Sequence, residues 1–485
     1  MENKKSFIGH FAIIGSGVFI NLILSVATTL ILTRVVDPNE YGQFSLFVMY
    51  ESIAIMVLCL GMDQALARYY YEIDSVEYRK ELYNKCIRIP IISSAIVSFV
   101  TFALSYFQII ELEFPTFIIF FLCVYTISEL IYRFDQLVIR LSYESKLYSR
   151  LNVLQKMTYS TLAIILVLTT GINGFAVLSF SMCTSFFVCM ILSAIKMKRI
   201  LNCVASRYEG NSISYAELLR YAYPYVFSMG ITTLFQSLDR ISLSHFRTYS
   251  EVGVYSAATA LVRVFSVIQI SFSTLWAPMA IEHYSQDKKD QLFYQNGNRI
   301  ITVIMFGVGL SLILFKDILA FVLGEKYREA ASILPFLVYN PIMYTVSETT
   351  VTGLVFTKKS QYHVVIALGA CISNAIGNYW LVPIFGCKGA ALSTGVSYIV
   401  FFTLRTIMSN HFFYVDYELK KFAILTAFSL AYAFYNTFMK GIIISILGYF
   451  ICVILLVFLY KDTIIMMIHY LKNTIRHKEP RLHLK

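Results

Sequence analysis

Long uninterrupted apolar runs dominate this chain and restrict its fold more than any other feature. A helix of about 20 apolar residues crosses the roughly 30 Å hydrocarbon core of a bilayer. The runs are too long and too uniformly apolar for a membrane β-barrel, and an open strand would leave unpaired backbone groups in lipid. We therefore predict an all-α polytopic membrane protein with fourteen transmembrane helices. The predicted spans are residues 9–33, 44–67, 87–107, 114–138, 151–170, 174–195, 217–245, 252–280, 299–323, 330–356, 361–383, 388–410, 419–438 and 441–460.

The composition agrees with a chain that faces lipid or other helices. Only 14% of the 485 residues are charged, whereas a soluble domain carries about 25%. The formal net charge of +11 would suggest a nucleic-acid partner in a soluble protein, but we expect none here. Topology signals in cytoplasmic loops or a cationic interior for an anionic substrate explain this charge. The nine cysteines include no C-x-x-C pair, so we expect neither a metal site nor a disulfide framework.

The distribution of Lys and Arg orients the helices. With the N-terminus in the cytoplasm, 31 of the 40 basic residues fall on or near the cytoplasmic side, 7 fall outside, and two lie within spans. Because basic residues mark cytoplasmic loops, we expect both termini in the cytoplasm. The weakest outer loop is 316–329, which holds three basic residues. The first span is too long for the apolar region of a signal peptide, so we expect it to be retained.

Two short motifs recur along the chain and predict an internal duplication. EYGQFS at 40–45 recurs as EVGVYS at 251–256, and GINGFA at 171–176 recurs as GCKGAA at 386–391. The first motif follows spans 1 and 7, and the second follows spans 5 and 11. Six spans in each repeat give both halves the same orientation, which is a parallel repeat about an axis normal to the membrane.

The duplication predicts the domain organisation. We expect a six-helix bundle in residues 1–200, a second in 201–414, two additional spans in 415–462 and a basic cytoplasmic tail in 463–485. Within the first motif region, Asp37 and Pro38 are predicted to end the first helix.

Four segments give the chain a resemblance to a known family. They are LTRVVDPNEYGQFSLF (32–47), GMDQALARYYYE (61–72), FSTLWAPMAIEHY (272–284) and GCKGAALST (386–394). The chain resembles the polysaccharide flippases, which are the O-antigen and capsule repeat-unit transporters of the multidrug/oligosaccharidyl-lipid/polysaccharide (MOP) superfamily. Relatives of this family include the peptidoglycan-precursor flippases and the multidrug antiporters. The resemblance covers nearly the whole chain, including the fourteen-helix count.

The resemblance implies a V-shaped central cavity between the two bundles. A polyprenyl-pyrophosphate-linked oligosaccharide would enter from the cytoplasmic leaflet, and its head group would cross while the lipid tail stays in the bilayer. The two extra helices would form a groove for that tail. The protein would alternate between inward- and outward-open states, coupled to a proton or sodium gradient and without a cofactor. It would be a monomer in the bacterial cytoplasmic (inner) membrane, working with the polymerase and chain-length proteins of the pathway.

Intramembrane arginines are the first candidates for substrate contact, because an unpaired charge in hydrocarbon is costly. Arg263 lies near the middle of span 8 and cannot lose its charge. We interpret it as a pyrophosphate ligand, with a fixed ion pair to Glu348 or Glu51 as the alternative. Arg240 is a second candidate, with a salt bridge that locks the bundle as its alternative. Its neighbour Asp239 points about 100° away around the helix.

Span 4 carries a stripe of polar residues. Glu129, Arg133, Gln136 and Arg140 share one helix face because they follow the spacing i, i+4, i+7, i+11. The stripe lies in the cytoplasmic half, where the head group would enter, so we predict that Arg133 and Arg140 line the cavity. The alternative is that Glu129 and Arg133 pair with each other, and that Arg140 extends its side chain to the membrane surface at the end of the helix.

Five carboxylates are candidates for ion coupling or for pairing with the arginines, because a carboxylate in a low dielectric can carry a proton. They are Glu129, Asp63, Glu51, Asp239 and Glu348. Arg34, at the outer end of span 1, is interpreted as a gate or interface residue.

Two other classes of function remain as alternatives. A drug/cation antiporter of the same superfamily would have twelve helices and an acidic cavity, so the two additional helices and the basic bias argue against it. A polysaccharide polymerase or glycosyltransferase would need a large outer loop or an acidic metal-binding pair on a soluble face. The sequence has no D-x-D, H-E-x-x-H, G-x-S-x-G or P-loop motif. We therefore expect no catalytic residue and do not expect an enzyme.

Overall fold

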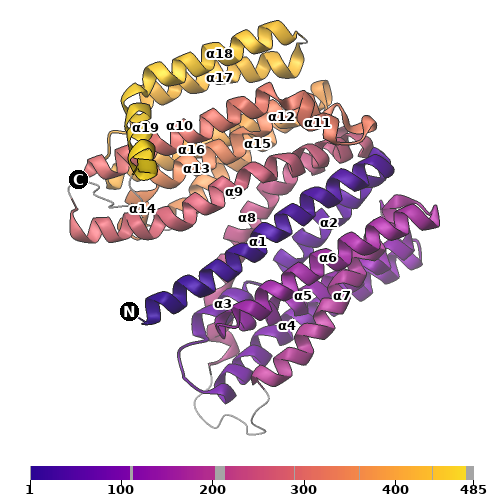
Figure 1. Cartoon of the computed structure of the whole chain (residues 1–485). Coiled ribbons are helices and arrows are strands. Elements are labelled where there is room, and N and C mark those ends of the chain that lie inside the picture. Colours follow the sequence, from indigo (N-terminus) through magenta and orange to yellow (C-terminus); the bar gives the residue numbers. More distant parts are fainter. Residues whose placement is uncertain are drawn as a thin grey trace. The chain divides into compact units, whose positions relative to one another are not determined.

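The structure, which is a computed structural model, is built of helices (Figure 1). It describes residues 2–109, 113–201, 213–288, 290–359, 361–439 and 441–476, and these residues contain no strand. The chain divides into two compact units. The N-terminal unit comprises residues 1–244 and 248–256, and the C-terminal unit comprises residues 245–247 and 257–485.

The N-terminal unit consists of long helices that run side by side (Figure 1). Its helices are α1 (Glu2–Val35), α2 (Pro38–Leu58), α3 (Met62–Tyr69), α4 (Val76–Tyr106), α5 (Thr116–Leu141), α6 (Ser145–Thr170), α7 (Gly174–Leu201), α8 (Tyr215–Phe246) and the first turns of α9 (Tyr249–Gln286). Helix α5 packs against α7, and α1 packs against α6.

The C-terminal unit contains the rest of α9 and all later helices. These are α10 (Gln291–Leu314), α11 (Lys316–Val322), the 3₁₀ turn η1 (Glu325–Tyr327), α12 (Ala330–Leu337), α13 (Tyr339–Thr350), α14 (Thr352–Phe356), α15 (Tyr362–Phe385), α16 (Cys387–Phe412), α17 (Leu419–Phe438), α18 (Ile442–Leu459) and α19 (Lys461–Arg476). Helix α16 packs against both α15 and α13. The predicted bundle boundary at residue 200 stays a prediction.

Each of the fourteen predicted spans falls mainly on helix, with turns inside the second, ninth and tenth, and this confirms the all-α membrane fold. Within the described residues, twelve helical segments are long and apolar enough to cross a membrane. The other two predicted spans fall on α8 and α17, which are helical but are not among those twelve. The exact count of fourteen is therefore not confirmed.

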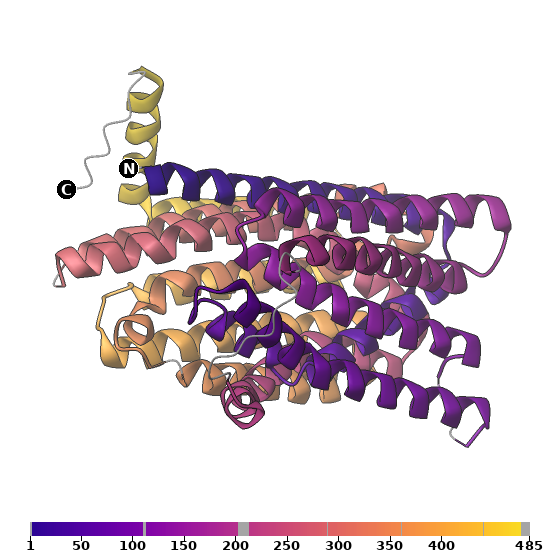
Figure 2. The ribbon, with the colours of Figure 1, turned by 90° about the horizontal axis from the view of Figure 1, so that it is seen from below.

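The last helix covers part of the predicted basic tail. A single residue, Tyr460, separates α18 from α19, which turns away from it (Figure 2). Residues 477–485 of that tail lie outside the described residues.

Gly61 separates α2 from α3 inside the predicted second span. Its φ of +68° is left-handed, a conformation that glycine adopts without a steric penalty. A Cβ at this position would lie 2.4 Å from the carbonyl oxygen of Ala222 on α8. The glycine thus allows both the turn and the close approach of α8, and it starts α3, which carries Asp63.

Asp37 and Pro38 form the turn between α1 and α2. Helix α1 ends at Val35, and the Asp37 side chain caps α2 by accepting a hydrogen bond from the backbone N–H of Asn39 at 3.1 Å. Pro38 occupies the first helical position, where its missing N–H costs nothing. The predicted helix end is confirmed.

The first repeated motif meets its own copy. Gly42 on α2 and Gly253 on α9 pack backbone to backbone, since a Cβ on Gly42 would lie 1.8 Å from the carbonyl oxygen of Tyr249 and 2.9 Å from the nitrogen of Gly253. One turn further along, the hydroxyls of Ser45 and Ser256 form a hydrogen bond of 2.6 Å. Equivalent residues of the two repeats are therefore direct neighbours.

The second repeated motif places a glycine with a positive φ at the end of a helix in both copies. Gly171 ends α6 with a φ of +59°, and its repeat partner Gly386 ends α15 with a φ of +57°. Both positions need glycine because a side chain would be strained there. The two turns differ in ψ, which is 10° at Gly171 and −132° at Gly386, so the repeated glycines end their helices with different backbone turns.

A buried apolar cluster holds α3 against α5 in the N-terminal unit. Met62, Leu66, Phe134 and Val138 are fully buried in this cluster. Burying each such side chain contributes about 1.5–3 kcal/mol. This packing places the charged residues of α3 beside those of α5.

Candidate functional site

An ion pair joins two of the predicted site residues in the N-terminal unit. Arg133 on α5 donates from Nη2 to Oδ2 of Asp63 on α3 at 2.9 Å, and from Nε to the same oxygen at 3.3 Å. The Asp63 side chain is almost completely buried, while that of Arg133 is 38% exposed. Arg133 therefore takes its partner from α3, and part of its guanidinium stays accessible.

A pair of buried carboxyl groups lies nearby. Glu51 on α2 lies beside Glu129 on α5, and both are close to Tyr125. Only 1% of Glu51 is exposed. The Oε1 atom of Glu51 and the Oε2 atom of Glu129 have no hydrogen-bond partner in the described part of the chain. Two carboxyl groups can bond to each other only if one carries a proton, because ionised carboxylates are acceptors alone. The structure thus brings together two of the carboxylates predicted as candidates for ion coupling.

The rest of the polar stripe on α5 has two environments. Gln136 is buried and donates to the Tyr132 hydroxyl at 2.8 Å. Arg140 is exposed near the end of the helix. The stripe thus brings Glu129 and Arg133 close to other predicted site residues but leaves Arg140 at the surface.

Asp239 and Arg240 are neighbours on α8 but lie in different environments. Asp239 is buried and accepts a 2.5 Å hydrogen bond from the hydroxyl of Tyr255, a residue of the repeated motif on α9. Arg240 is half-buried. Asp239 thus joins α8 to the start of α9. Arg34 is exposed at the last turn of α1.

Arg263 is an exposed cation on the C-terminal unit's part of α9. None of the described residues forms an ion pair with it. Neither carboxylate named as its alternative partner is available, since Glu348 pairs with Arg405 and Glu51 with Glu129. An exposed guanidinium of this kind can bind a phosphate oxygen without first breaking a salt bridge.

Arg405 and Glu348 form a buried ion pair in the C-terminal unit. Nη1 of Arg405 on α16 lies 2.8 Å from Oε1 of Glu348 on α13 and donates to the Ser347 hydroxyl at 2.7 Å. The rings of Tyr344 and Phe401 each lie 5.5 Å from the guanidinium carbon. Cation–π contact of this kind stabilises a desolvated arginine.

Sequence reasoning missed two buried charged residues. Arg405 lies near the end of its span, so it was counted as a cytoplasmic topology signal. Asp135 on α5 is 1% exposed and accepts hydrogen bonds of 2.6 Å from the hydroxyls of Tyr83 on α4 and Ser193 on α7. A carboxylate two residues from Arg133 inside an apolar span was the available signal for Asp135.

Comparisons with solved structures identify the class of fold. The lipid II flippase MurJ, in an inward closed conformation, superposes with a TM-score of 0.66 at 15% identity, over 93% of this chain and 99% of that chain. An inward-facing multidrug resistance MATE family transporter of the MOP superfamily gives a TM-score of 0.58 at 13% identity, over 81% of this chain and 94% of that chain. A MATE transporter of Vibrio cholerae gives 0.51 at 15% identity, over 84% and 96%. The protein therefore has the fold of MOP superfamily transporters.

A family model described as "Polysaccharide biosynthesis protein" matches residues 9–283, which is more than half of the chain. The chain belongs to this family and is a multi-pass membrane protein. A search of curated proteins finds no match.

Proposed function

We propose that the protein is a flippase for polyprenyl-pyrophosphate-linked oligosaccharide repeat units. It moves them by alternating access from the cytoplasmic to the outer leaflet of the bacterial cytoplasmic membrane, where they are assembled into a surface polysaccharide. Both termini lie in the cytoplasm, and the protein acts as a monomer beside the polymerase and chain-length proteins of the pathway.

The extent of the structural match carries this proposal. The MurJ fold covers 93% of the chain, whereas the two MATE folds cover 81% and 84%. Part of the chain therefore lies outside the MATE transporter fold, which agrees with two helices in addition to a twelve-helix core. The name of the matching family, with its reference to polysaccharide biosynthesis, supports a lipid-linked saccharide as the substrate.

Arg263 is the residue proposed to bind the pyrophosphate. It is exposed, it is charged at every physiological pH, and no described carboxylate neutralises it. A guanidinium can contact two phosphate oxygens at once, which a lysine ammonium cannot do in the same geometry. Arg240, Arg133 and Arg140 are proposed as further cationic contacts along the path.

Replacement of Arg263 tests the function. We expect Arg263→Ala to lower head-group translocation about 10- to 100-fold, because a charge-assisted hydrogen bond contributes about 1.5–3 kcal/mol. Arg263→Lys should restore only part of this loss. The measurement is translocation of the lipid-linked repeat unit in proteoliposomes, together with surface polysaccharide in cells that carry the variant as their only copy.

The matched control is Arg328→Ala. Arg328 is an exposed arginine of the same unit, paired with Glu325 at 2.9 Å, and its loss should leave translocation unchanged. Normal translocation and normal polysaccharide with a stable, inserted Arg263→Ala protein would refute the pyrophosphate contact. Failure of the unmodified protein to translocate the repeat unit would refute the flippase.

A cation antiporter is the second candidate, since the buried Glu51–Glu129 pair and the MATE-like fold both suit it. Export of a cationic dye from vesicles by the purified protein, without translocation of the lipid-linked saccharide, would favour this candidate over the flippase.

A further inference from the structure

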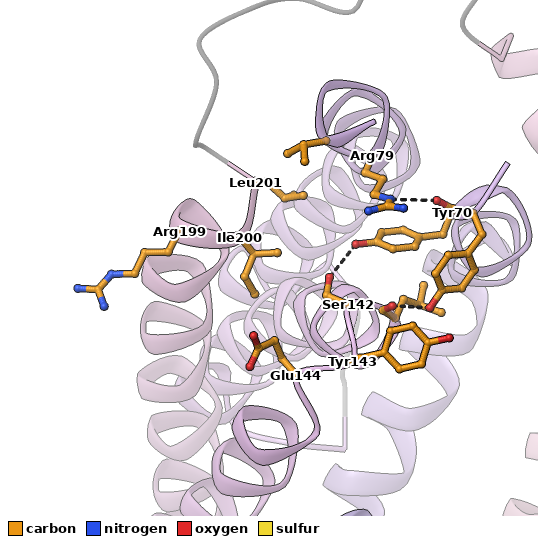
Figure 3. Close-up of a pocket in the computed structure, with 11 residues that line it drawn as sticks. Tyr70, Arg79, Ser142, Tyr143, Glu144, Arg199, Ile200 and Leu201 are labelled. Atoms are coloured by element: carbon orange, nitrogen blue, oxygen red, sulfur yellow. Dashed lines mark hydrogen bonds between the residues drawn. The ribbon is translucent and has the colours of Figure 1, made fainter. Parts of the chain in front are cut away.

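A pocket of about 510 Å³ lies at one end of the N-terminal unit, apart from the charged residues described above. Its walls come from the residues after α3, the start of α4, the turn between α5 and α6, and the end of α7 (Figure 3). All of these segments belong to or adjoin connections predicted to face the cytoplasm. The volume is in the range that proteins use for small organic ligands.

Exposed tyrosine rings form one wall of this pocket. The Tyr71 and Tyr143 rings are 49% and 63% exposed, and their centroids lie 6.2 Å apart. The Tyr71 hydroxyl donates to the Leu141 carbonyl oxygen, which fixes the ring. Tyr70 stands edge-on to Tyr71 at 5.2 Å, and its hydroxyl bonds to Ser142 at 2.7 Å. The wall is therefore held in place before any ligand arrives.

Tyr143 occupies its position at a conformational cost. Its φ of +60° is left-handed, which is uncommon for a bulky residue, and it closes the end of α5, where the Glu144 N–H donates to the Ile139 carbonyl oxygen at 3.2 Å. Because 63% of Tyr143 is exposed, burial of its ring contributes little stabilisation to offset that cost. A ring displayed in this way is available to stack on a ligand.

The charged groups of the pocket favour a neutral ligand over a phosphate. Arg79 already pairs with Asp74 at 2.7 Å and lies over the Tyr70 ring at 5.1 Å. Arg199 points away from the other labelled side chains in Figure 3. The exposed Glu144 carboxylate would repel a phosphate but would accept hydrogen bonds from sugar hydroxyls.

We propose that this tyrosine pocket binds a sugar unit of the lipid-linked head group on the cytoplasmic side, before the head group crosses the membrane. The C–H face of a sugar ring packs on the rings of Tyr71 and Tyr143, while the Glu144 carboxylate and the Tyr71 hydroxyl oxygen accept hydrogen bonds from its hydroxyl groups. This inference rests on the proposed flippase function and adds a capture site outside the arginine path.

The chemistry of Tyr71 agrees with this role. Burial and the neighbouring Tyr143 hydroxyl raise the pKa of Tyr71 to about 12, so the phenol is neutral at cytoplasmic pH. Its one hydroxyl proton is donated to the Leu141 carbonyl oxygen, so the neutral phenol can accept a hydrogen bond from a sugar hydroxyl.

The test measures binding of a soluble saccharide to the full-length protein in lipid nanodiscs. The probe is the repeat-unit oligosaccharide released from its lipid pyrophosphate by mild acid, and inorganic pyrophosphate is titrated separately. Binding is followed by saturation-transfer NMR, with Tyr143→Ala, Tyr143→Phe and the control Tyr106→Ala. Tyr106 is 65% exposed and does not line the pocket.

We expect Tyr143→Ala to weaken saccharide binding about tenfold, as loss of an aromatic contact does. Tyr143→Phe and Tyr106→Ala should bind as the unmodified protein does, and pyrophosphate binding should be the same in all four proteins. Equal saccharide binding by Tyr143→Ala, or pyrophosphate binding that this variant loses, overturns the sugar site. So does the absence of saccharide binding to a protein that translocates the lipid-linked substrate. If the unmodified protein does not translocate that substrate, the proposed function fails instead.

Discussion

At the level of single residues, the two units hold their buried charges in different ways. In the N-terminal unit, Glu51 and Glu129 lie beside each other, and we expect them to share a proton, which would remove the repulsion between them. In the C-terminal unit, Arg405 and Glu348 neutralise each other at 2.8 Å. A proton can leave the first pair without breaking a salt bridge, whereas the second pair is fixed as long as both side chains are present. We therefore regard Arg405 as a structural residue and Glu51 as a functional candidate.

Removal of Arg405 should destabilise the protein more than removal of the whole ion pair. Arg405→Met leaves the Glu348 carboxylate buried without its partner, which costs about 3 kcal/mol. The double variant Arg405→Met with Glu348→Gln removes both charges and should regain most of this loss. Thermal unfolding of the protein in detergent measures both effects. Equal midpoints for the single and double variants would show that the charge on Glu348 does not cause the loss.

At the level of helices, the crossing of α2 and α9 depends on two glycines. The backbones touch at Gly42 and Gly253, and no side chain lies between them that could move aside. The Ser45–Ser256 hydrogen bond then fixes the rotation of one helix against the other. The crossing is therefore a rigid contact, which must either persist through transport or separate as a whole.

Substitution of Gly42 tests how tightly the helices cross. Gly42→Ala would place a Cβ 1.8 Å from a backbone oxygen, and overpacking of this kind costs about 1–3 kcal/mol. We expect a lower thermal midpoint with normal membrane insertion.

The control for this substitution is Gly307→Ala on α10. A Cβ at Gly307 meets nothing within 4 Å, and alanine favours helix over glycine, so the midpoint should stay the same or rise. Similar destabilisation by both substitutions would contradict the close crossing.

A disulfide across the crossing tests whether it separates during transport. With hydroxyls 2.6 Å apart, the paired variant Ser45→Cys with Ser256→Cys places its sulfurs within reach of a bond. Mild oxidation should join the two peptides, as detected by mass spectrometry, and should stop translocation until a reductant is added.

Each single cysteine variant serves as a control for the native cysteines. Full translocation by the cross-linked protein would show that the crossing stays closed throughout the cycle.

At the level of the whole molecule, the buried acid pair predicts coupling to protons. We expect an imposed pH gradient to change the translocation rate in vesicles. Glu51→Gln keeps the shape of the side chain but cannot release a proton, so this response should disappear. Asp317→Asn, at a side chain that is 74% exposed, should respond as the unmodified protein does. A translocation rate that does not change with either a proton or a sodium gradient would exclude coupling to these ions.

The sequence predicted the helices because each apolar run contains its own evidence. It named Asp63 as one of five possible partners of the arginines but could not assign it to Arg133. Spacing along α5 suggested Glu129, whereas the observed partner is Asp63, which lies 70 residues away and approaches only because Gly61 turns the chain into α3. The sequence also could not predict the tyrosine pocket, since Tyr71 and Tyr143 come from separate connections between helices. Local patterns therefore predicted the elements, and contacts between distant segments determined the sites.

The meeting of Ser45 with Ser256 has a consequence for the history of the chain. If the two halves descend from one shorter gene, these serines were once the same residue in two identical subunits. Each glycine and serine of the crossing would then have touched its own copy across a two-fold axis, as in an isologous dimer. Fusion of the genes would have freed the two copies to diverge, as Phe44 and Tyr255 have done, while the ancestral subunit contact survived inside a single polypeptide.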